Sequence, residues 1–274
     1  MDKPLRVLLT GASGYLGHYL EAALRAEPRL AVVTAGRADG DDVRLDLGAP
    51  TSVAAVLAEV KPAVIVHAGA LSRIATCEAD PELARRVNTT ATEALCAGRA
   101  RVVFTSTDLV FDGEAAPYTR AARPAPRSEY GASKVGGEHA VLASRGGVVV
   151  RLPLLFGRSF DGRRGATDML RSAHAEGREV TLFTDEFRTP LHVASAARAV
   201  VEMVFDATRT GIVHAAGGER VSRMELGARF LARHPLAGLV VRGGERGDAS
   251  RPRDVSLVPD WGEERGLAEG LGES

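Results

Sequence analysis

A tyrosine and a lysine stand four positions apart in the segment EYGASKVGGEH, at Tyr130 and Lys134. In a helix this spacing places both side chains on the same face. A phenol ordinarily keeps its proton up to a pH of about 10, and a neighbouring ammonium group favours the phenolate. The pair is therefore a candidate proton donor near neutral pH. Because the same spacing also occurs on solvated helix faces, the pair needs support from the rest of the chain.

The glycine-rich segment TGASGYLGHYL forms a second candidate site, with Gly11, Gly14 and Gly17 spaced three residues apart. Glycine permits a tight turn and a close approach of the backbone to a pyrophosphate, and a helix N-terminus offers free N–H groups. Because the segment follows an apolar run and opens a helical pattern, it predicts dinucleotide binding rather than glycines that serve packing alone. The residues expected to contact the cofactor here are Gly11, Ser13, Gly14, Tyr15, Leu16 and Gly17.

The choice between the two nicotinamide cofactors depends on the residues after the second apolar run. A site for NAD usually places a carboxylate about 20 residues beyond the glycines, to hold the 2′-hydroxyl of the ribose. Arg37 occupies that region in TAGR, and a guanidinium suits the 2′-phosphate of NADP. We therefore expect NADP, whereas Asp39, Asp41 and Asp42 keep NAD open. Two further contacts, to an edge of the adenine, are expected from RLDL at Asp46 and Leu47.

The composition excludes several classes of partner. Thirty-five basic residues balance 35 acidic ones among 274, so no bulk field attracts nucleic acid or an anionic membrane. Cys77 and Cys96 are the two cysteines, which argues against a disulfide framework and fits a reducing cytoplasm. The sequence shows no signal-peptide pattern, no apolar run of membrane-spanning length and no Cys/His cluster with the spacing of a metal site. We expect a cytoplasmic protein that acts on a small molecule, without a metal.

Alternating strand and helix patterns must position these residues. Apolar runs at 5–10, 31–36, 63–69, 101–106 and 147–152 predict buried parallel strands, and helices are expected to start near Tyr15, Thr51, Glu82 and Ser128. A capping box from Ser222 to Glu225 predicts a later helix. The fold class is therefore α/β, with a Rossmann-type doubly wound parallel sheet over residues 1–152 and a smaller substrate-binding lobe over 153–274, from which 188–217 is expected to return to the Rossmann domain.

Taken together, these motifs resemble the extended short-chain dehydrogenase/reductases. The segments TGASGYLG, HAGA, VN at 87–88, FTSTDLVFDG and YGASK match that superfamily in order and spacing. The segments STDLVFDG, CEADPELARRVN, FRTPLHV and RPRDVSL are similar to those of the dTDP-4-dehydrorhamnose reductases. The resemblance covers nearly the whole chain. It implies a Rossmann domain with a small substrate lobe, acting on a nucleotide-linked keto-sugar.

The resemblance also implies roles for individual residues. Tyr130 would be the general acid, and Lys134 would lower its pKa and bind the nicotinamide ribose. Thr107 would bind the substrate carbonyl, and Asn88 would belong to the supporting polar network. The turn at His67, Ala68 and Gly69 would line the cofactor, with His67 structural rather than catalytic. Arg188 and Arg251 resemble positions that bind the phosphates of a sugar nucleotide, although each is also credible as a surface arginine. Ala194 and Ser195 depart from the family, which commonly has an acidic residue after the His-Val pair.

These roles favour reduction of a keto group on a nucleotide-linked deoxysugar, but alternatives remain. An epimerase that retains NAD is not excluded by any single residue. A dehydratase is disfavoured, because such enzymes follow the threonine with an Asp-Glu pair and here Asp108 is followed by Leu109. A non-catalytic NADP-binding protein, resembling the regulatory subunit of methionine adenosyltransferase, is an alternative of another class. The sequence leaves a homodimer open.

Overall fold

The structure is a computed structural model that describes residues 3–247, 250–262 and 267–272. Within this part of the chain, the central element is an eight-stranded sheet of parallel strands in the order β14-β11-β6-β5-β4-β1-β2-β3. Its strands are β1 (Leu5–Thr10), β2 (Leu30–Gly36), β3 (Val43–Arg44), β4 (Val64–His67), β5 (Arg101–Thr107), β6 (Val148–Leu152), β11 (Gly211–Ala216) and β14 (Trp261–Gly262). The predicted α/β class with a doubly wound sheet is confirmed.

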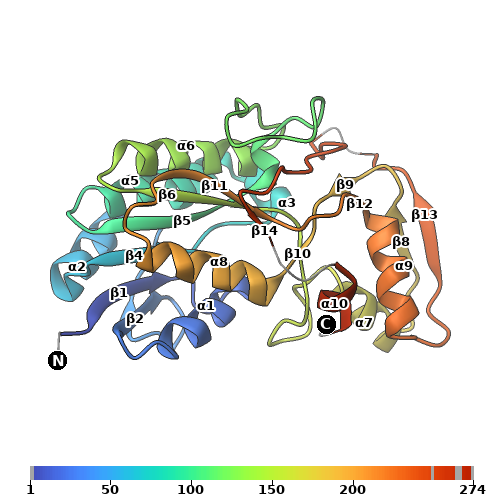
Figure 1. The fold of residues 1–274 in the computed structure, drawn as a ribbon, viewed down its shortest axis with the longest axis horizontal. Helices are drawn as coiled ribbons and strands as arrows, with labels where there is room; N and C mark the ends of the chain where they lie inside the picture. The colour runs from blue at the N-terminus through green and yellow to red at the C-terminus, as the bar shows by residue number, and fades with distance from the viewer. Residues whose placement is uncertain (1–2, 248–249, 263–266, 273–274) are drawn as a thin grey trace.

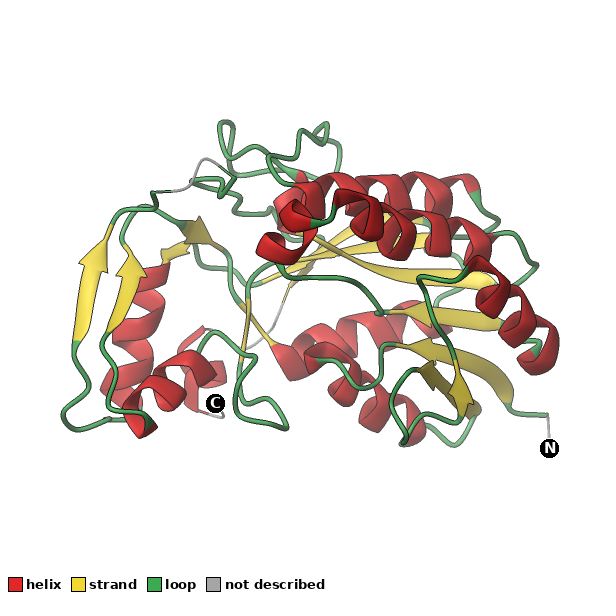
Figure 2. Cartoon of the chain, turned by 180° about the vertical axis from the view of Figure 1, so that it is seen from behind, coloured by secondary structure: helices red, strands yellow, loops and turns green. Residues whose placement is uncertain are grey.

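Helices cover both faces of this sheet because successive strand residues point to opposite sides. In β1, Val7 and Leu9 join the core under α1 and α8, whereas Leu8 joins the core under α2, α5 and α6. Figures 1 and 2 show the two helical layers on either side of the strands. The covering helices are α1 (Tyr15–Arg25), α2 (Pro50–Val60), α5 (Ala91–Cys96), α6 (Glu129–Ala143) and α8 (Val193–Phe205). The short helices α3 (Ile74–Ala79) and α4 (Pro81–Arg85) pack against α6, and a π-helical turn at Arg86–Thr90 follows them.

A smaller lobe follows β6 and lies at the right of Figure 1. Its core joins Phe156, Leu170, Leu182, Leu226 and Phe230, all of them buried. Its elements are β7 (Leu155–Phe156), α7 (Asp168–Ala175), β8 (Val180–Phe183), β9 (Phe187–Arg188), β10 (Leu191–His192), β12 (Val221–Ser222), α9 (Arg223–Arg233), β13 (Val241–Gly244) and α10 (Leu267–Gly272). Between β10 and β12 the chain returns to the large sheet through α8 and β11. The division at residue 152 stays a prediction.

The predicted elements agree closely with the observed ones. Each of the five expected strands is present, α1 begins at Tyr15, and the capping box opens α9 as expected. Ser128 caps α6 by accepting a hydrogen bond from the backbone N–H of Gly131 at 3.1 Å. Within residues 1–152 the short elements β3 and α3 were not anticipated, because two and six residues are too few to show a period. Beyond residue 152 only α9 was predicted as an individual element, so α8 and β11 were not anticipated either. None of the described helices is both long and apolar enough to cross a bilayer.

Candidate active site

The turn between β1 and α1 is shaped by glycines that no larger residue could replace without a shift of the backbone. Gly11 has a φ of +78°, and a Cβ built there would lie 2.6 Å from the Cα of Gly69. A Cβ on Gly17 would lie 1.8 Å from the carbonyl oxygen of Gly11. Gly14 caps α1 without a side-chain hydrogen bond, so the first N–H groups of the helix stay available to an anion. This cradle fits the pyrophosphate of a dinucleotide.

The neighbouring turn after β4 closes the same cradle. His67 is buried, with Nδ1 2.6 Å from Oγ1 of Thr10 and Nε2 3.1 Å from Oγ1 of Thr92. Burial, with a smaller contribution from the charge of Lys134, lowers the pKa of His67 to about 3, so the ring is neutral. His67 therefore supports the turn at Ala68 and Gly69 as a fixed hydrogen-bonding group.

The end of β2 presents Arg37 to solvent. Its side chain has no hydrogen bond or ion pair to any described residue, so its guanidinium is available to a ligand. Two of the nearby aspartates are engaged within the protein. Asp41 accepts a hydrogen bond from the backbone N–H of Ala38 at 3.0 Å, and Asp42 accepts from the backbone N–H of Thr34 at 2.9 Å. Among residues 37–42, Arg37 and Asp39 are thus the two charged side chains that are exposed and have no hydrogen bond or ion pair to another described residue.

The predicted adenine contacts lie on the next turn. Asp46 is exposed, and its Oδ1 accepts a hydrogen bond from the backbone N–H of Gly48 at 2.9 Å. Leu47 lies close to the second glycine turn, because its Cδ1 would be 2.8 Å from a Cβ built on Gly69. An apolar side chain beside the glycine cradle fits the face of an adenine.

The candidate catalytic residues meet at the carboxyl end of β5. Thr107 is the last residue of that strand, and its Oγ1 accepts a hydrogen bond from the backbone N–H of Leu109 at 3.2 Å. Tyr130 lies in the first turn of α6, which contacts the 3-10 turn Asp108–Val110. The hydroxyl of Thr107 lies close enough to Tyr130 to oppose the rise in the pKa of the phenol. The structure therefore brings two of the predicted catalytic groups together, at the sheet edge where ligands bind in open α/β folds.

Burial dominates the electrostatics of both Lys134 and Tyr130. Its ammonium lies 3.9 Å from the centroid of the Phe104 ring, and burial lowers its pKa to about 7, against the opposing charge of Glu138. The pKa of Tyr130 is raised rather than lowered, mainly by burial and secondly by the carboxylate of Asp108. The expectation that Lys134 lowers the phenol's pKa stays a prediction, because burial dominates the pKa shifts of both groups.

Asn88 fixes the catalytic helix to the loop after β4. It is buried in the π-helical turn, where its Nδ2 donates to the carbonyl of Leu71 and to Oγ of Ser133, each at 2.9 Å. Its Oδ1 accepts from the backbone N–H of Leu71 at 2.8 Å. The amide of Asn88 thus ties Ser133, the residue before Lys134, to the loop after β4, and its role in a catalytic network stays a prediction.

The predicted phosphate ligand Arg188 is buried and already engaged. Its Nε lies 3.4 Å from Oδ2 of Asp108, its Nη2 lies 3.3 Å from Oε1 of Glu186, and its Nη1 donates to the carbonyl of Phe187 at 2.7 Å. Arg251 is 43% exposed, with Nη1 3.7 Å from Oε2 of Glu186. Of the two, Arg251 is the one with a surface to offer a ligand.

The sequence analysis did not predict that Glu186 and Arg223 belong to this cluster. Glu186 is buried and lies between Arg188, Arg251 and Arg223, whose Nε is 3.9 Å away. The capping box located Arg223 at the start of α9, but no sequence signal pairs it with a carboxylate 37 positions earlier. Burial raises the pKa of Asp108 to about 6, although Arg188 and the hydroxyl of Thr107 oppose this shift.

A second buried network underlies Lys134. Glu138 accepts hydrogen bonds from Nε of Arg151 at 2.9 Å, from Nη2 of Arg151 at 2.6 Å and from Oγ of Ser106 at 2.5 Å. Arg151 in turn lies 3.4 Å from Nε2 of His214. One signal was available in the sequence, because an arginine inside the apolar strand GVVVRL requires a buried partner.

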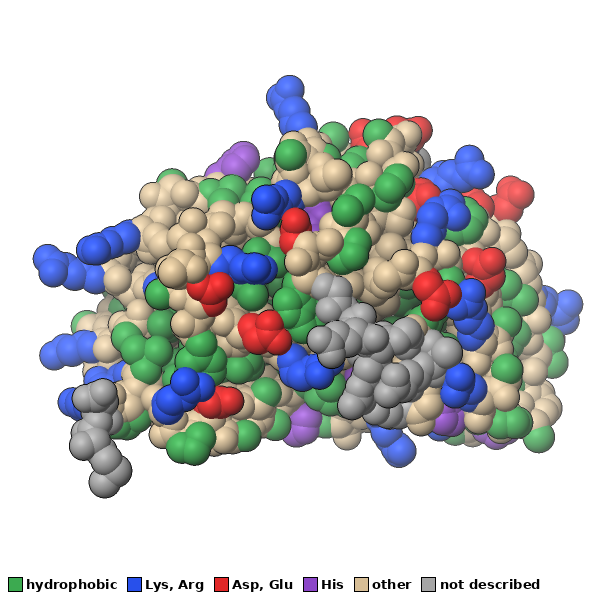
Figure 3. Space-filling model, in the orientation of Figure 1, with side chains coloured by type: hydrophobic (Ala, Val, Ile, Leu, Met, Phe, Trp, Pro, Cys, Tyr) green, Lys and Arg blue, Asp and Glu red, His purple; other side chains and the backbone are tan. Residues whose placement is uncertain are grey.

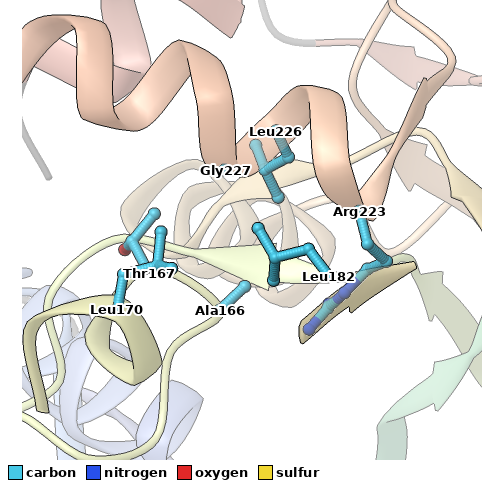
Figure 4. A pocket seen from close by; sticks show the side chains of 7 residues that line it. All are labelled: Ala166, Thr167, Leu170, Leu182, Arg223, Leu226 and Gly227. Carbon is cyan, nitrogen blue, oxygen red and sulfur yellow. The ribbon is translucent and has the colours of Figure 1, made fainter. Parts of the chain in front are cut away.

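Two cavities are lined by described residues, and neither lining includes Thr107 or Tyr130. The hollow drawn in Figure 4 holds about 10 Å³ and is lined by seven residues of the small lobe, among them Leu170, Leu182 and Arg223. That is room for about one water molecule. A polar cleft of about 270 Å³ lies between the loop at Gly113 and the segment at Arg253. Among the described residues, no group of His, Cys, Asp and Glu side chains could hold a metal ion.

Comparison with known proteins agrees with this geometry. The RmlD substrate binding domain family matches residues 5–257. The chain belongs to this family. The resemblance inferred from the motifs is thereby confirmed, and the family match spans both the glycine turn and the segment RPRDVSL.

The proteins to which this chain is similar have names that describe different functions. Methionine adenosyltransferase 2 subunit beta of Xenopus laevis is 31% identical over 233 residues, which cover 81% of this chain and 70% of that one. A probable dTDP-4,6-dihydroxy-2-methyloxan-3-one 4-ketoreductase of Streptomyces antibioticus is 34% identical over 218 residues, covering 77% and 71%. The crystal structure of dTDP-4-dehydrorhamnose reductase from Bacillus anthracis in complex with NADP has a TM-score of 0.87 at 23% identity, covering 99% and 98%. At that identity the likeness shows the shared fold.

Proposed function

We propose that the protein is an NAD(P)H-dependent reductase of a keto group on a nucleotide-linked deoxysugar. The observation that carries the proposal is the meeting of Thr107 and Tyr130 at the carboxyl end of β5, next to a glycine cradle that fits a dinucleotide. The relative named as a 4-ketoreductase supports a keto-sugar as the substrate class. When bound, the nicotinamide supplies the hydride.

The residues at the site account for the proton. Thr107 holds the substrate carbonyl beside the phenol of Tyr130, which donates its proton to the oxygen as negative charge develops there. Burial and the carboxylate of Asp108 raise the pKa of Tyr130, so the phenol carries its proton in the protein alone and has it available to donate. Lys134 is positioned by Asn88 and Glu138 to bind the ribose on the nicotinamide side. Arg251, at the exposed side of the Glu186 cluster, is proposed to meet the substrate phosphates.

We further propose that NADPH is preferred over NADH. Arg37 is exposed at the end of β2 without a partner among the described residues, whereas Asp41 and Asp42 are bonded to the backbone of the same region. A guanidinium in that place favours a 2′-phosphate through charge-assisted hydrogen bonds.

The test is turnover of purified protein with NADPH and a panel of nucleotide-linked 4-keto-6-deoxy sugars, followed at the absorbance of NADPH. The wild type should oxidise NADPH with at least one member of the panel. Tyr130→Phe should lose about a hundredfold or more, since general acid catalysis contributes at least that much. Failure of every sugar would refute the reaction class, and a Tyr130→Phe loss smaller than about threefold would refute the proton donor.

A second candidate function is supported by the similarity to a methionine adenosyltransferase subunit. In that case the protein would bind a partner protein and turn over no substrate, since a shared fold does not fix the function. Purification from the native host separates the two. A stable complex that forms equally well with Tyr130→Phe, together with no turnover, would favour the regulatory function.

A further inference from the structure

The segment between β7 and α7 reaches from the small lobe to the glycine turn. We call residues 157–167 the arginine loop, because it carries Arg158, Arg163 and Arg164. The hydroxyl of Tyr15 donates to the carbonyl of Gly157 at 2.8 Å, and that of Tyr19 donates to the carbonyl of Arg158 at 2.6 Å. The loop is therefore attached to the first two turns of α1, the helix whose N-terminus closes the cradle.

Internal hydrogen bonds fix the shape of the arginine loop. Oδ2 of the buried Asp168 accepts from the backbone N–H groups of Ser159 at 2.8 Å and Gly165 at 3.1 Å. Oγ of Ser159, which is also buried, accepts from the backbone N–H groups of Arg163 at 3.0 Å and Arg164 at 3.1 Å. Two buried polar groups thus organise the backbone that carries both arginines.

Arg164 extends from this loop onto the glycine turn itself. Its Nη1 donates to the carbonyl of Ser13 at 3.0 Å, and its Nε donates to Oδ2 of Asp161 at 2.8 Å. The guanidinium also lies 4.9 Å from the centroid of the Phe160 ring. Of its five N–H groups, these two are bonded, and the other three have no partner in the described part of the chain. The guanidinium of Arg164 is therefore held next to Ser13, a residue of the turn between Gly11 and Gly14, with three N–H donors free of partners among the described residues.

We propose that Arg164 binds the pyrophosphate of the nicotinamide dinucleotide, in addition to the backbone of the glycine turn. The N-terminus of α1 contributes only about half an elementary charge, whereas a pyrophosphate carries two negative charges and a guanidinium supplies a full positive charge with a planar fork of donors. Because NADPH and NADH share the pyrophosphate, Arg164 contributes equally to both, unlike Arg37. The small lobe thereby takes part in cofactor binding. The inference rests on the proposed function, since it presupposes a nicotinamide cofactor.

The test compares Arg164→Ala with Arg163→Ala by calorimetric titration of NADPH, NADH and 2′-AMP. Arg163 is a matched control, because it is the adjacent exposed arginine and its side chain has no hydrogen bond or ion pair to the described residues. Arg164 is 44% exposed, so its removal should not impair folding. Because solvent screens an exposed charge, we expect an effect at the low end of what a charge-assisted hydrogen bond contributes to binding. We expect about a tenfold loss of affinity for NADPH and NADH alike, with 2′-AMP unchanged.

The outcomes separate the inference from the proposed function. An unchanged affinity of Arg164→Ala for both dinucleotides, with wild-type binding intact, would overturn the role of Arg164 and leave the reductase proposal standing. An equal loss for 2′-AMP, which has no pyrophosphate, would show that Arg164 only supports the structure and would overturn the inference too. An equal effect of Arg163→Ala would reduce the role to general charge and would also contradict it. If the wild type binds neither dinucleotide, the proposed function and the inference fail together.

Discussion

The buried pair of Arg151 and Glu138 makes a prediction whose size follows from the structure. Both side chains are sealed from solvent, at 0% and 1% exposure, and two hydrogen bonds join them. Glu138→Gln keeps the shape but leaves the guanidinium of Arg151 without a counter-charge. Removing one partner of a buried pair costs about 3–5 kcal/mol, because the remaining charge stays desolvated. We expect the free energy of unfolding to fall by that amount. This is a large part of the total free energy of unfolding, which is ~5–15 kcal/mol for native proteins.

The assay is urea unfolding followed by circular dichroism, with linear extrapolation to water. Ser106→Ala serves as the control, because it removes a single neutral donor from Glu138 and should cost about 1 kcal/mol. The double variant Glu138→Leu with Arg151→Met should recover most of the loss, since apolar replacement of a whole buried pair is often neutral. A loss below about 1 kcal/mol for Glu138→Gln would refute the claim that this pair is desolvated and coupled.

Three further predictions concern the cofactor site and the catalytic helix. Arg37→Ala should weaken NADPH by about ten- to a hundredfold and leave NADH unchanged in fluorescence titrations, and equal losses would refute a 2′-phosphate contact. Gly17→Ala should abolish NADPH binding, because its Cβ would lie 1.8 Å from the carbonyl oxygen of Gly11. Gly14→Ala should have a milder effect, since its Cβ would lie 3.0 Å from the same oxygen, and the reverse order of effects would contradict the described turn. Folding lowers the pKa of Lys134 from 10.5 to about 7, so the unfolded chain binds more protons between these values and stability should rise with pH across that window. Lys134→Met should flatten this rise in thermal unfolding between about pH 7 and 10, and an unchanged slope would show that Lys134 is not buried as described.

The fold was predictable because its signals are local. Runs such as LRVLLT and RVVFTS are apolar over strand length, and residues on both faces of the sheet are buried, so the pattern requires no knowledge of neighbours. The numbers of acidic and basic residues are equal, so the net charge did not argue against this fold. Acidic and basic side chains are interspersed on the face drawn in Figure 3. By contrast, β3 spans only Val43–Arg44 and exists because β2 pairs with it.

The candidate site was predictable only where chemistry and spacing coincide on one segment. Tyr130 and Lys134 share a helix, and Thr107 ends a recognisable strand, so their placement follows from local structure. The electrostatics did not follow, because the ring of Phe104 beneath Lys134 comes from another element. Likewise Glu186, which holds arginines from β9 and α9, is defined by tertiary contacts that no motif encodes.

The central claim is that a hydride passes from NADPH to a sugar carbonyl while Tyr130 donates the proton. Its most direct test is to incubate the protein with NADPH that carries deuterium at both C4 positions of the dihydronicotinamide and with a nucleotide-linked 4-keto-6-deoxy sugar, and to examine the sugar product by mass spectrometry and NMR. We predict a hydroxy-sugar that carries deuterium on the reduced carbon, formed in step with NADP and nearly absent with Tyr130→Phe. A product without deuterium, or conversion of a hydroxy-sugar without any added cofactor, would contradict the account.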